Sequence, residues 1–374
     1  MPRGMIVFAF DARVGTEIKT KFPADLDITS DILMRIYSTH SFEESGGFLS
    51  MIIGSLNVAS YFTGPETNHY VSLILSMDED PDTFEDALTD AAREIMANLQ
   101  NDRYLDLVPS IYNRIKLYPT FEEEQKIAVA YADMTKRIIL DRLIEDGSAT
   151  KTDLLTWIRE KTGLEFIDID AILNSLVKLG LVKISSVKGL PSESVFLTSD
   201  VFITRAPAVA IIKKSQAEEI KNPMARDYLA SVKSYFKNYT PTPEDEKLIS
   251  NIMADTDTYK ILNLLRLSIV NRKGLDKLSK QIEDMDGALK KIWSAGLIQV
   301  LKDKQGEEFY YLKTDIRIEK FYPEYLVNKI RQAYEQKTIS NPVLKEHLKH
   351  LRDQFIDLKG LEKLRKKEKG DEKD

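Results

Sequence analysis

Cysteine is absent from this chain of 374 residues. Disulfide bonds, thiolate zinc sites and cysteine nucleophiles are therefore excluded. Long hydrophobic runs are also absent: the apolar run over residues 5–10 ends at Asp11, and no later run reaches about 18 residues. Such short runs fit neither a signal-peptide core nor a membrane span. The sequence therefore predicts a soluble, cytoplasmic protein without a membrane span.

Motifs that bind nucleotide phosphates are missing as well. The sequence contains neither Gly-x-x-x-x-Gly-Lys-[Ser/Thr] nor Gly-x-Gly-x-x-Gly. Four histidines occur, and their spacing from serine and carboxylate residues indicates no catalytic triad. His347 and His350 lie three positions apart, but no third metal ligand accompanies them. We therefore expect a protein that is not an enzyme and has no cofactor or metal.

The composition is that of a folded protein. Apolar residues make up 43% of the chain and charged residues 30%, so hydrophobic cores can form. The length favours about two to four domains. The formal net charge of −6 argues against a chain that lies wholly along nucleic acid.

One stretch of the sequence occurs twice. The first copy reads LVKLGLVKI from residue 176 and returns as VFLTSDVFI from residue 195. The second reads KIWSAGLIQVL from residue 291 and returns as FYYLKTDIRI from residue 309. Gly180 and Gly296 lie 116 positions apart, and Leu197 and Leu312 lie 115 apart. Each copy predicts a helix that ends at a glycine, followed by a two-stranded ribbon.

The helix, the turn and the ribbon resemble the last helix and the wing of winged-helix domains, including archaeal ones. The resemblance covers roughly residues 130–205 and 250–325. It implies two winged-helix domains, a class that binds DNA in some families and proteins in others. The expected helices span residues 148–162 and 168–179 in the first copy, and 257–267, 274–282 and 286–295 in the second.

The N-terminal part follows a different pattern. Residues 5–10 and 16–22 are predicted strands, and Ile32, Leu33 and Ile36 lie on one face of a predicted helix. Three further strands are expected over residues 48–53, 57–62 and 70–77, and two helices over 83–99 and 102–118. This order resembles the longin-like fold, a relative of the profilin and roadblock folds. Longin-like domains bind proteins, often small GTPases and their regulators, so the resemblance implies a small GTPase as a candidate partner.

The expected fold class is α+β. It comprises an N-terminal longin-like mixed α/β sandwich, two winged-helix domains and a C-terminal helix. A single helix from Phe121 to Asp146 would join the first two domains. The predicted domains are residues 1–118 (longin-like), 120–207 (first winged helix), 208–248 (helical linker), 249–325 (second winged helix) and 326–374 (C-terminal helices and a charged tail).

Six lysines on the predicted last helices and wings are candidates for contact with nucleic acid. They are Lys183, Lys188, Lys290, Lys291, Lys302 and Lys304. Neither of these helices contains arginine, the commonest reader of guanine edges. Both are net negative, through Glu165, Asp168 and Asp170 in the first and Glu283, Asp284 and Asp286 in the second. This charge disfavours contact with a polyanion.

The last predicted helix carries an apolar stripe about two heptads long. Its members are Leu344, Leu348, Leu351, Phe355 and Leu358. Such a stripe is buried either against the second winged helix of the same chain or against a second copy in a homodimer. Both alternatives remain open at this point.

Two functions remain open as well. The first is a scaffold that binds protein partners, such as a small GTPase, through the longin-like domain and the winged helices. The second is a winged-helix transcription regulator that binds DNA and uses the longin-like domain as a sensor or dimerisation module. We also expect Gly180 and Gly296 to end their helices with a positive φ, because only glycine adopts it without steric cost.

Overall fold

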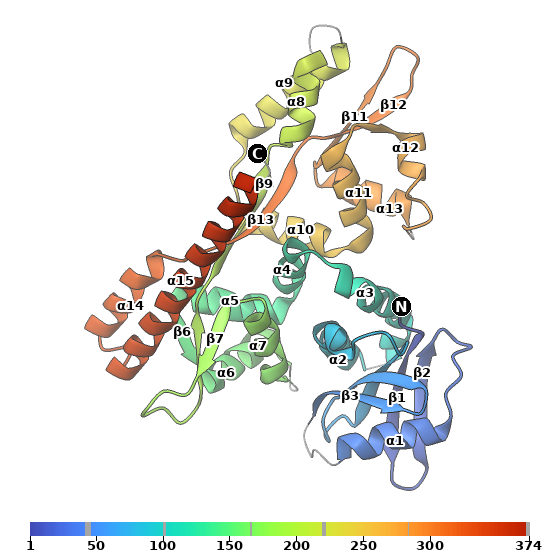
Figure 1. The fold of residues 1–374 in the computed structure, drawn as a ribbon, viewed down its shortest axis with the longest axis vertical. Coiled ribbons are helices and arrows are strands. Elements are labelled where there is room, and N and C mark those ends of the chain that lie inside the picture. The colour runs from blue at the N-terminus through green and yellow to red at the C-terminus, as the bar shows by residue number, and fades with distance from the viewer. Residues whose placement is uncertain (42–45, 100–101, 165–166, 219–221, 283, 372–374) are drawn as a thin grey trace. The chain divides into compact units, whose positions relative to one another are not determined.

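The computed structural model describes residues 1–41, 46–99, 102–164, 167–218, 222–282 and 284–371, with side chains to residue 358. The chain forms two compact units, residues 1–121 and residues 122–374 (Figure 1). Both mix helices with small sheets, so the expected α+β class is confirmed. Among the described helices, none is long and apolar enough to cross a membrane.

The first unit has one antiparallel sheet of five strands, in the order β2-β1-β5-β4-β3. The predicted order of elements is the observed one. Its elements are β1 (Gly4–Asp11), β2 (Gly15–Phe22), α1 (Ser30–Ser41), β3 (Gly47–Ile53), β4 (Leu56–Phe62), β5 (His69–Leu75), η1 (Pro81–Phe84), α2 (Glu85–Ala97), α3 (Tyr104–Leu117) and η3 (Tyr118–Thr120).

Helices cover both faces of this sheet. Leu33 and Ile36 of α1 join a core with Phe8, Val58 and Tyr70. Successive side chains of a strand point to opposite faces, so residues at alternate positions form the other face. There α2 contacts β4 and β5, and α3 contacts β2. The strand β3 is the last in the sheet order, so one of its edges has no strand partner within the described residues.

The second unit is built from two copies of one arrangement, here called the first repeat (residues 122–240) and the second repeat (residues 241–371). The elements of the first repeat are α4 (Glu123–Ala132), α5 (Met134–Asp146), β6 (Ser148–Thr150), α6 (Lys151–Thr162), α7 (Ile169–Lys178), β7 (Val182–Ser185), β8 (Ser194–Leu197), β9 (Asp200–Ala206), α8 (Val209–Glu218) and α9 (Pro223–Asn238). Those of the second are α10 (Pro243–Ala254), α11 (Thr256–Leu267), β10 (Val270–Asn271), α12 (Arg272–Asp276), α13 (Met285–Ser294), β11 (Ile298–Lys302), β12 (Glu308–Leu312), β13 (Asp315–Phe321), α14 (Tyr325–Glu335) and α15 (Asn341–Asp371).

The two repeats are joined by their own equivalent strands. Strand β9 pairs antiparallel with β13, and Ile203 lies opposite Ile318, its equivalent 115 positions later. Equivalent residues therefore meet at the centre of this ribbon, as they do on a two-fold axis. Buried side chains from both repeats form one continuous core. The repeats thus resemble the two subunits of a symmetric dimer within one chain.

The C-terminal helices of each repeat pack on the other repeat. Helix α8 contacts α11, and α14 contacts α5 (Figure 1). Equivalent hydrogen bonds hold these helices on the other repeat. The Tyr228 hydroxyl donates to the Leu312 carbonyl at 2.8 Å, and His347 Nε2 donates to the Leu197 carbonyl at 2.9 Å. Two lysines repeat the same symmetry: Lys214 donates to the Leu267 carbonyl, and Lys329 donates to the carbonyls of Ile144 and of Glu145, which is the equivalent of Leu267.

The arrangement differs from the sequence-based expectation in three places. Residues 208–248, expected as a helical linker, are indeed helical but do not link separate domains, because Ile211 of α8 and Tyr228 of α9 belong to the shared core. The expected helix from Phe121 to Asp146 is broken at Asp133, which has extended backbone angles and caps α5. The expected helix over residues 274–282 ends at Asp276, and turns follow it.

Both glycines at the helix ends have a φ of +70°, as expected. We predict that Gly296→Val lowers the free energy of unfolding of the second unit by about 1–3 kcal/mol, because a β-branched residue is strained at positive φ. Chemical denaturation measures the loss. Gly296→Asn is the control and should cost less, since asparagine tolerates this region. An unchanged stability for the valine variant would contradict the argument.

Candidate protein-interaction surfaces

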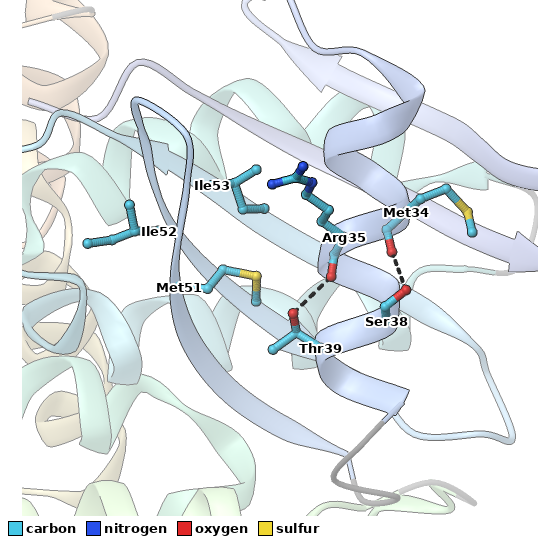
Figure 2. A pocket seen from close by; sticks show the side chains of 7 residues that line it. All are labelled: Met34, Arg35, Ser38, Thr39, Met51, Ile52 and Ile53. Atoms are coloured by element: carbon cyan, nitrogen blue, oxygen red, sulfur yellow. Dashed lines mark hydrogen bonds between the residues drawn. The ribbon is translucent and has the colours of Figure 1, made fainter.

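A hollow of about 370 Å³ lies between α1 and the edge strand β3. The residues that line it are Met34, Arg35, Ser38, Thr39, Met51, Ile52 and Ile53. Figure 2 shows the α1 residues on one side and the β3 residues on the other, with Arg35 extended toward Ile53. The hollow therefore has apolar side chains of β3 on one side and the positively charged Arg35 of α1 on the other.

The hydroxyl groups in the hollow are already paired. Ser38 Oγ donates to the Met34 carbonyl at 2.8 Å, and Thr39 Oγ1 donates to the Arg35 carbonyl at 2.9 Å (Figure 2). Such bonds from a helical hydroxyl to the preceding turn satisfy the polar group locally. An apolar side chain can therefore enter the hollow without separating a hydroxyl group from its partner.

The side chain of Ile52 is 67% exposed on β3. Its neighbours Met51 and Ile53 instead pack into the core below α1. This alternation is that of an edge strand with one buried face. A large apolar side chain beside an unpaired strand edge is the feature that proteins usually avoid, because it invites pairing with another chain.

A buried series of hydrogen-bonded side chains holds α1 on the sheet. His40 Nε2 lies 2.9 Å from Ser60 Oγ, which lies 2.9 Å from Ser72 Oγ. All three side chains are buried. Burial lowers the pKa of His40 from 6.5 to about 4, so the imidazole is neutral at physiological pH. This contact holds the helical wall of the hollow in place.

The six candidate lysines divide into two groups. Four of them are exposed. Lys183 and Lys188 lie on the hairpin of β7 and β8, Lys290 lies on α13, and Lys304 lies between β11 and β12. The other two are bound by carboxylates: Lys291 lies 2.6 Å from Asp255, and Lys302 lies 3.2 Å from Glu308. The structure therefore leaves four of the six available to a ligand.

The acidic side chains near the start of α7 and α13 have structural roles. Asp168 and Asp284 cap their helices by accepting from the backbone N–H groups of Ala171 and Gly287. Asp170 pairs with Lys151, and Asp286 pairs with Arg272. Glu165 and Glu283 lie outside the described residues. Two of these four carboxylates are therefore compensated by a cation, and the other two are stabilised at the N-terminus of their own helix.

The apolar stripe of α15 is split between two faces. Leu351 is buried, Leu344 and Leu358 are half-buried, and Leu348 and Phe355 are exposed. The stripe that is buried within the chain contains Val343, His347 and Leu351. It packs on the first repeat, where His347 and His350 both contact the Phe196 ring. The expected target in the same chain was the second winged helix, and only Phe355 of the stripe meets it, with its ring 5.2 Å from that of Tyr322.

Two exposed apolar side chains were not identified from the sequence. Ile52 was assigned only to a strand, and Trp293 only to a repeated helix. Periodicity identified both elements, but it could not show that β3 is an edge strand, because the strand order depends on distant pairing. No cluster of three or more potential metal ligands occurs in the part of the chain that the structure describes.

Comparison with protein-family models and with curated proteins finds no match to this chain.

Proposed function

We propose that this protein is a non-enzymatic adaptor that binds a partner protein at the hollow between α1 and β3. The observation that carries the proposal is the apolar hollow beside an unpaired strand edge. An extended segment of the partner adds a strand to β3 and inserts an apolar side chain against Met51 and Ile53. Main-chain hydrogen bonds then supply affinity, and the hollow supplies specificity.

The charge of the first unit favours one type of segment. Residues 1–121 contain 18 acidic and nine basic side chains. A segment with apolar residues and basic flanks is therefore attracted, and an acidic one is repelled. The resemblance to longin-like domains supports a protein partner and implies a small GTPase, or one of its regulators, as the class to test first.

The proposal predicts that Ile52→Arg removes partner binding without unfolding the unit. Ile52 is mostly exposed, so the change should alter the free energy of unfolding by no more than about 0.5 kcal/mol. The bulky charge would block the strand edge and repel basic flanks. Quantitative mass spectrometry of proteins captured by the full chain would show one or more partners lost.

The matched control is Ile18→Arg. Ile18 is also an exposed isoleucine, at 40%, and it lies on β2, the opposite edge strand of the same sheet. The control should retain the partners that Ile52→Arg loses. Equal loss in both variants, or loss in neither, would count against the hollow as the binding site.

A second function, DNA binding by the two repeats, has one observation in its favour. The repeats resemble winged helices, and they are related by a pseudo-two-fold axis through their paired strands β9 and β13. DNA-binding proteins with two-fold symmetry place one recognition element on each of two half-sites. Gel shifts at low salt with the full chain test it, because even non-specific binding to DNA is electrostatic. Absence of any shift would exclude this alternative.

A further inference from the structure

Helix α15 is held on the first repeat by two histidines, whereas its equivalent α9 is held on the second repeat by a tyrosine. His347 Nε2 donates to the Leu197 carbonyl at 2.9 Å, and Tyr228 occupies the equivalent position 119 residues earlier. His350 Nε2 lies 2.8 Å from Ser185 Oγ on β7. Helix α9 contains no histidine. Only one of the two equivalent contacts therefore has groups that titrate near neutral pH.

The second ring nitrogen of His347 has no acceptor for a proton. Because Nε2 donates to a carbonyl oxygen, Nδ1 is the nitrogen without a hydrogen in the neutral ring. Nδ1 is buried and has no hydrogen-bond partner among the described residues. The ring contacts Phe196, and a Cβ atom at Gly147 would lie only 3.2 Å from its Cε1. A proton on Nδ1 would therefore place an unpaired donor and a positive charge in a closely packed site.

The charged groups around the two rings do not offset this cost. In the described part of the chain, the titratable group whose charge acts on His347 is His350, which would carry the same charge. The groups that face His350 come from α15 and β7 and are mixed in sign: they are Glu346, Lys349, Asp353 and Lys183. Burial outweighs these charges and lowers the pKa of both histidines, that of His347 to about 4. Both rings are therefore neutral at pH 7.

We propose that protonation of His347 and His350 releases α15 from the first repeat while α9 stays on the second. In the docked state, Val343 of α15 is buried with Val187 and Phe196 of the β7–β8 hairpin. Release uncovers these two side chains, so the hairpin gains an accessible apolar surface in acid. The change is local, and it does not depend on the hollow between α1 and β3.

The expected size of the effect follows from the two states of His347. Its pKa is about 4 when α15 is docked and returns to the ordinary 6.5 when the helix is free. The free helix therefore takes up the proton first, so docking is complete above pH 6.5 and weakens as the pH falls toward 4. Between pH 7 and pH 5, His347 alone raises the ratio of released to docked α15 by about 20-fold. His350 acts in the same direction.

The absence of cysteine allows one introduced thiol to report the opening of each helix. Leu351→Cys on α15 and Val232→Cys on α9 are equivalent positions, and both side chains are buried. The full chain with either change is treated with a dipyridyl disulfide, which reacts with thiols in acid as well as at neutral pH. Each rate is divided by that of a short cysteine peptide at the same pH, so that it reports how often the helix is open.

We expect the normalised rate at Leu351→Cys to rise about 20-fold or more between pH 7 and pH 5. Low concentrations of urea should change it little, because release of one helix exposes far less surface than unfolding of the unit. Val232→Cys should stay slower at pH 5, because α9 remains docked. The added changes His347→Gln and His350→Gln should abolish the rise, since glutamine can donate a hydrogen bond but does not titrate.

Three results would overturn the proposal. The first is an unchanged rate at Leu351→Cys between pH 7 and pH 5. The second is a rise that is equally large and equally sensitive to urea at both thiols, because it would show that the whole unit unfolds. The third is a rise that survives both glutamine changes, because other groups would then control the helix.

Discussion

Arg205→Ala is expected to destabilise the second unit by about 3 kcal/mol or more, because it leaves a carboxylate without its partner in the junction between the repeats. Arg205 is buried and donates twice from Nε and Nη2 to Asp245, at 2.9 and 2.7 Å. Burial alone would raise the pKa of Asp245, but the bonds from Arg205 and Tyr239 outweigh it and lower the pKa. The loss of Arg205 would reverse that balance.

The repeat supplies the control for this prediction. Lys320 is equivalent to Arg205, and Glu123 is equivalent to Asp245. They form the same pair at 2.6 Å, but Glu123 is 62% exposed. Lys320→Ala should therefore cost only about 1 kcal/mol. Denaturant titration of the full chain compares the two variants, and equal losses would contradict the assigned difference in burial.

Acidification is expected to destabilise both units below pH 6.5. Burial lowers the pKa of His40 in the first unit and of His347 in the second to about 4, from an ordinary value of 6.5. The unfolded chain therefore takes up these protons before the folded chain does. The associated stability is complete above pH 6.5 and falls as the pH drops toward 4, by about 2 kcal/mol per histidine at pH 5.

Hydrogen exchange at pH 7 and pH 5 can resolve this loss by unit. His40→Asn should flatten the pH dependence of the first unit and leave that of the second unchanged. His347→Asn should do the reverse. A pH dependence that survives both changes would mean that other groups, such as the paired carboxylates, are responsible.

The first unit was predictable from the sequence because its elements have local signals. Alternating apolar residues and glycine turns predicted five strands, and the helical period of Leu33 and Ile36 predicted α1. The site was less visible. Ile52 lies beside a free strand edge because β3 is the last strand of the sheet. Strand β3 pairs with β4 along one edge and has no strand partner along the other among the described residues. No local pattern contains that information.

The repeat was visible in the sequence, but the pairing of its copies was not. The stretch over residues 195–203 reads as one strand. In the structure, the backbone N–H groups of Thr198 and Ser199 both donate to the Leu181 carbonyl, which ends β8 and redirects the chain. Strand β9 is then free to pair with β13, more than a hundred residues away. Such a long-range contact leaves no signature in hydrophobic periodicity.

The C-terminal helix illustrates a third limit. A pattern that counts only apolar residues selects Leu344, Leu348 and Leu351. The buried stripe instead includes His347, because its Nε2 donates to the Leu197 carbonyl and its ring contacts Phe196. One ring nitrogen of this histidine is therefore paired inside the core, while Nδ1 has no hydrogen-bond partner among the described residues. Polarity alone therefore misplaced the buried face by a fraction of a helical turn.

Hydrogen–deuterium exchange of the full chain with a captured partner tests the proposed adaptor function most directly. Addition of a strand to the free edge of β3 would pair backbone N–H groups that now face solvent. Strand addition predicts slower exchange over residues 47–53 in the complex, and no such change when the chain carries Ile52→Arg. Protection confined to other segments, with unchanged exchange over residues 47–53, would show that the partner does not bind at β3.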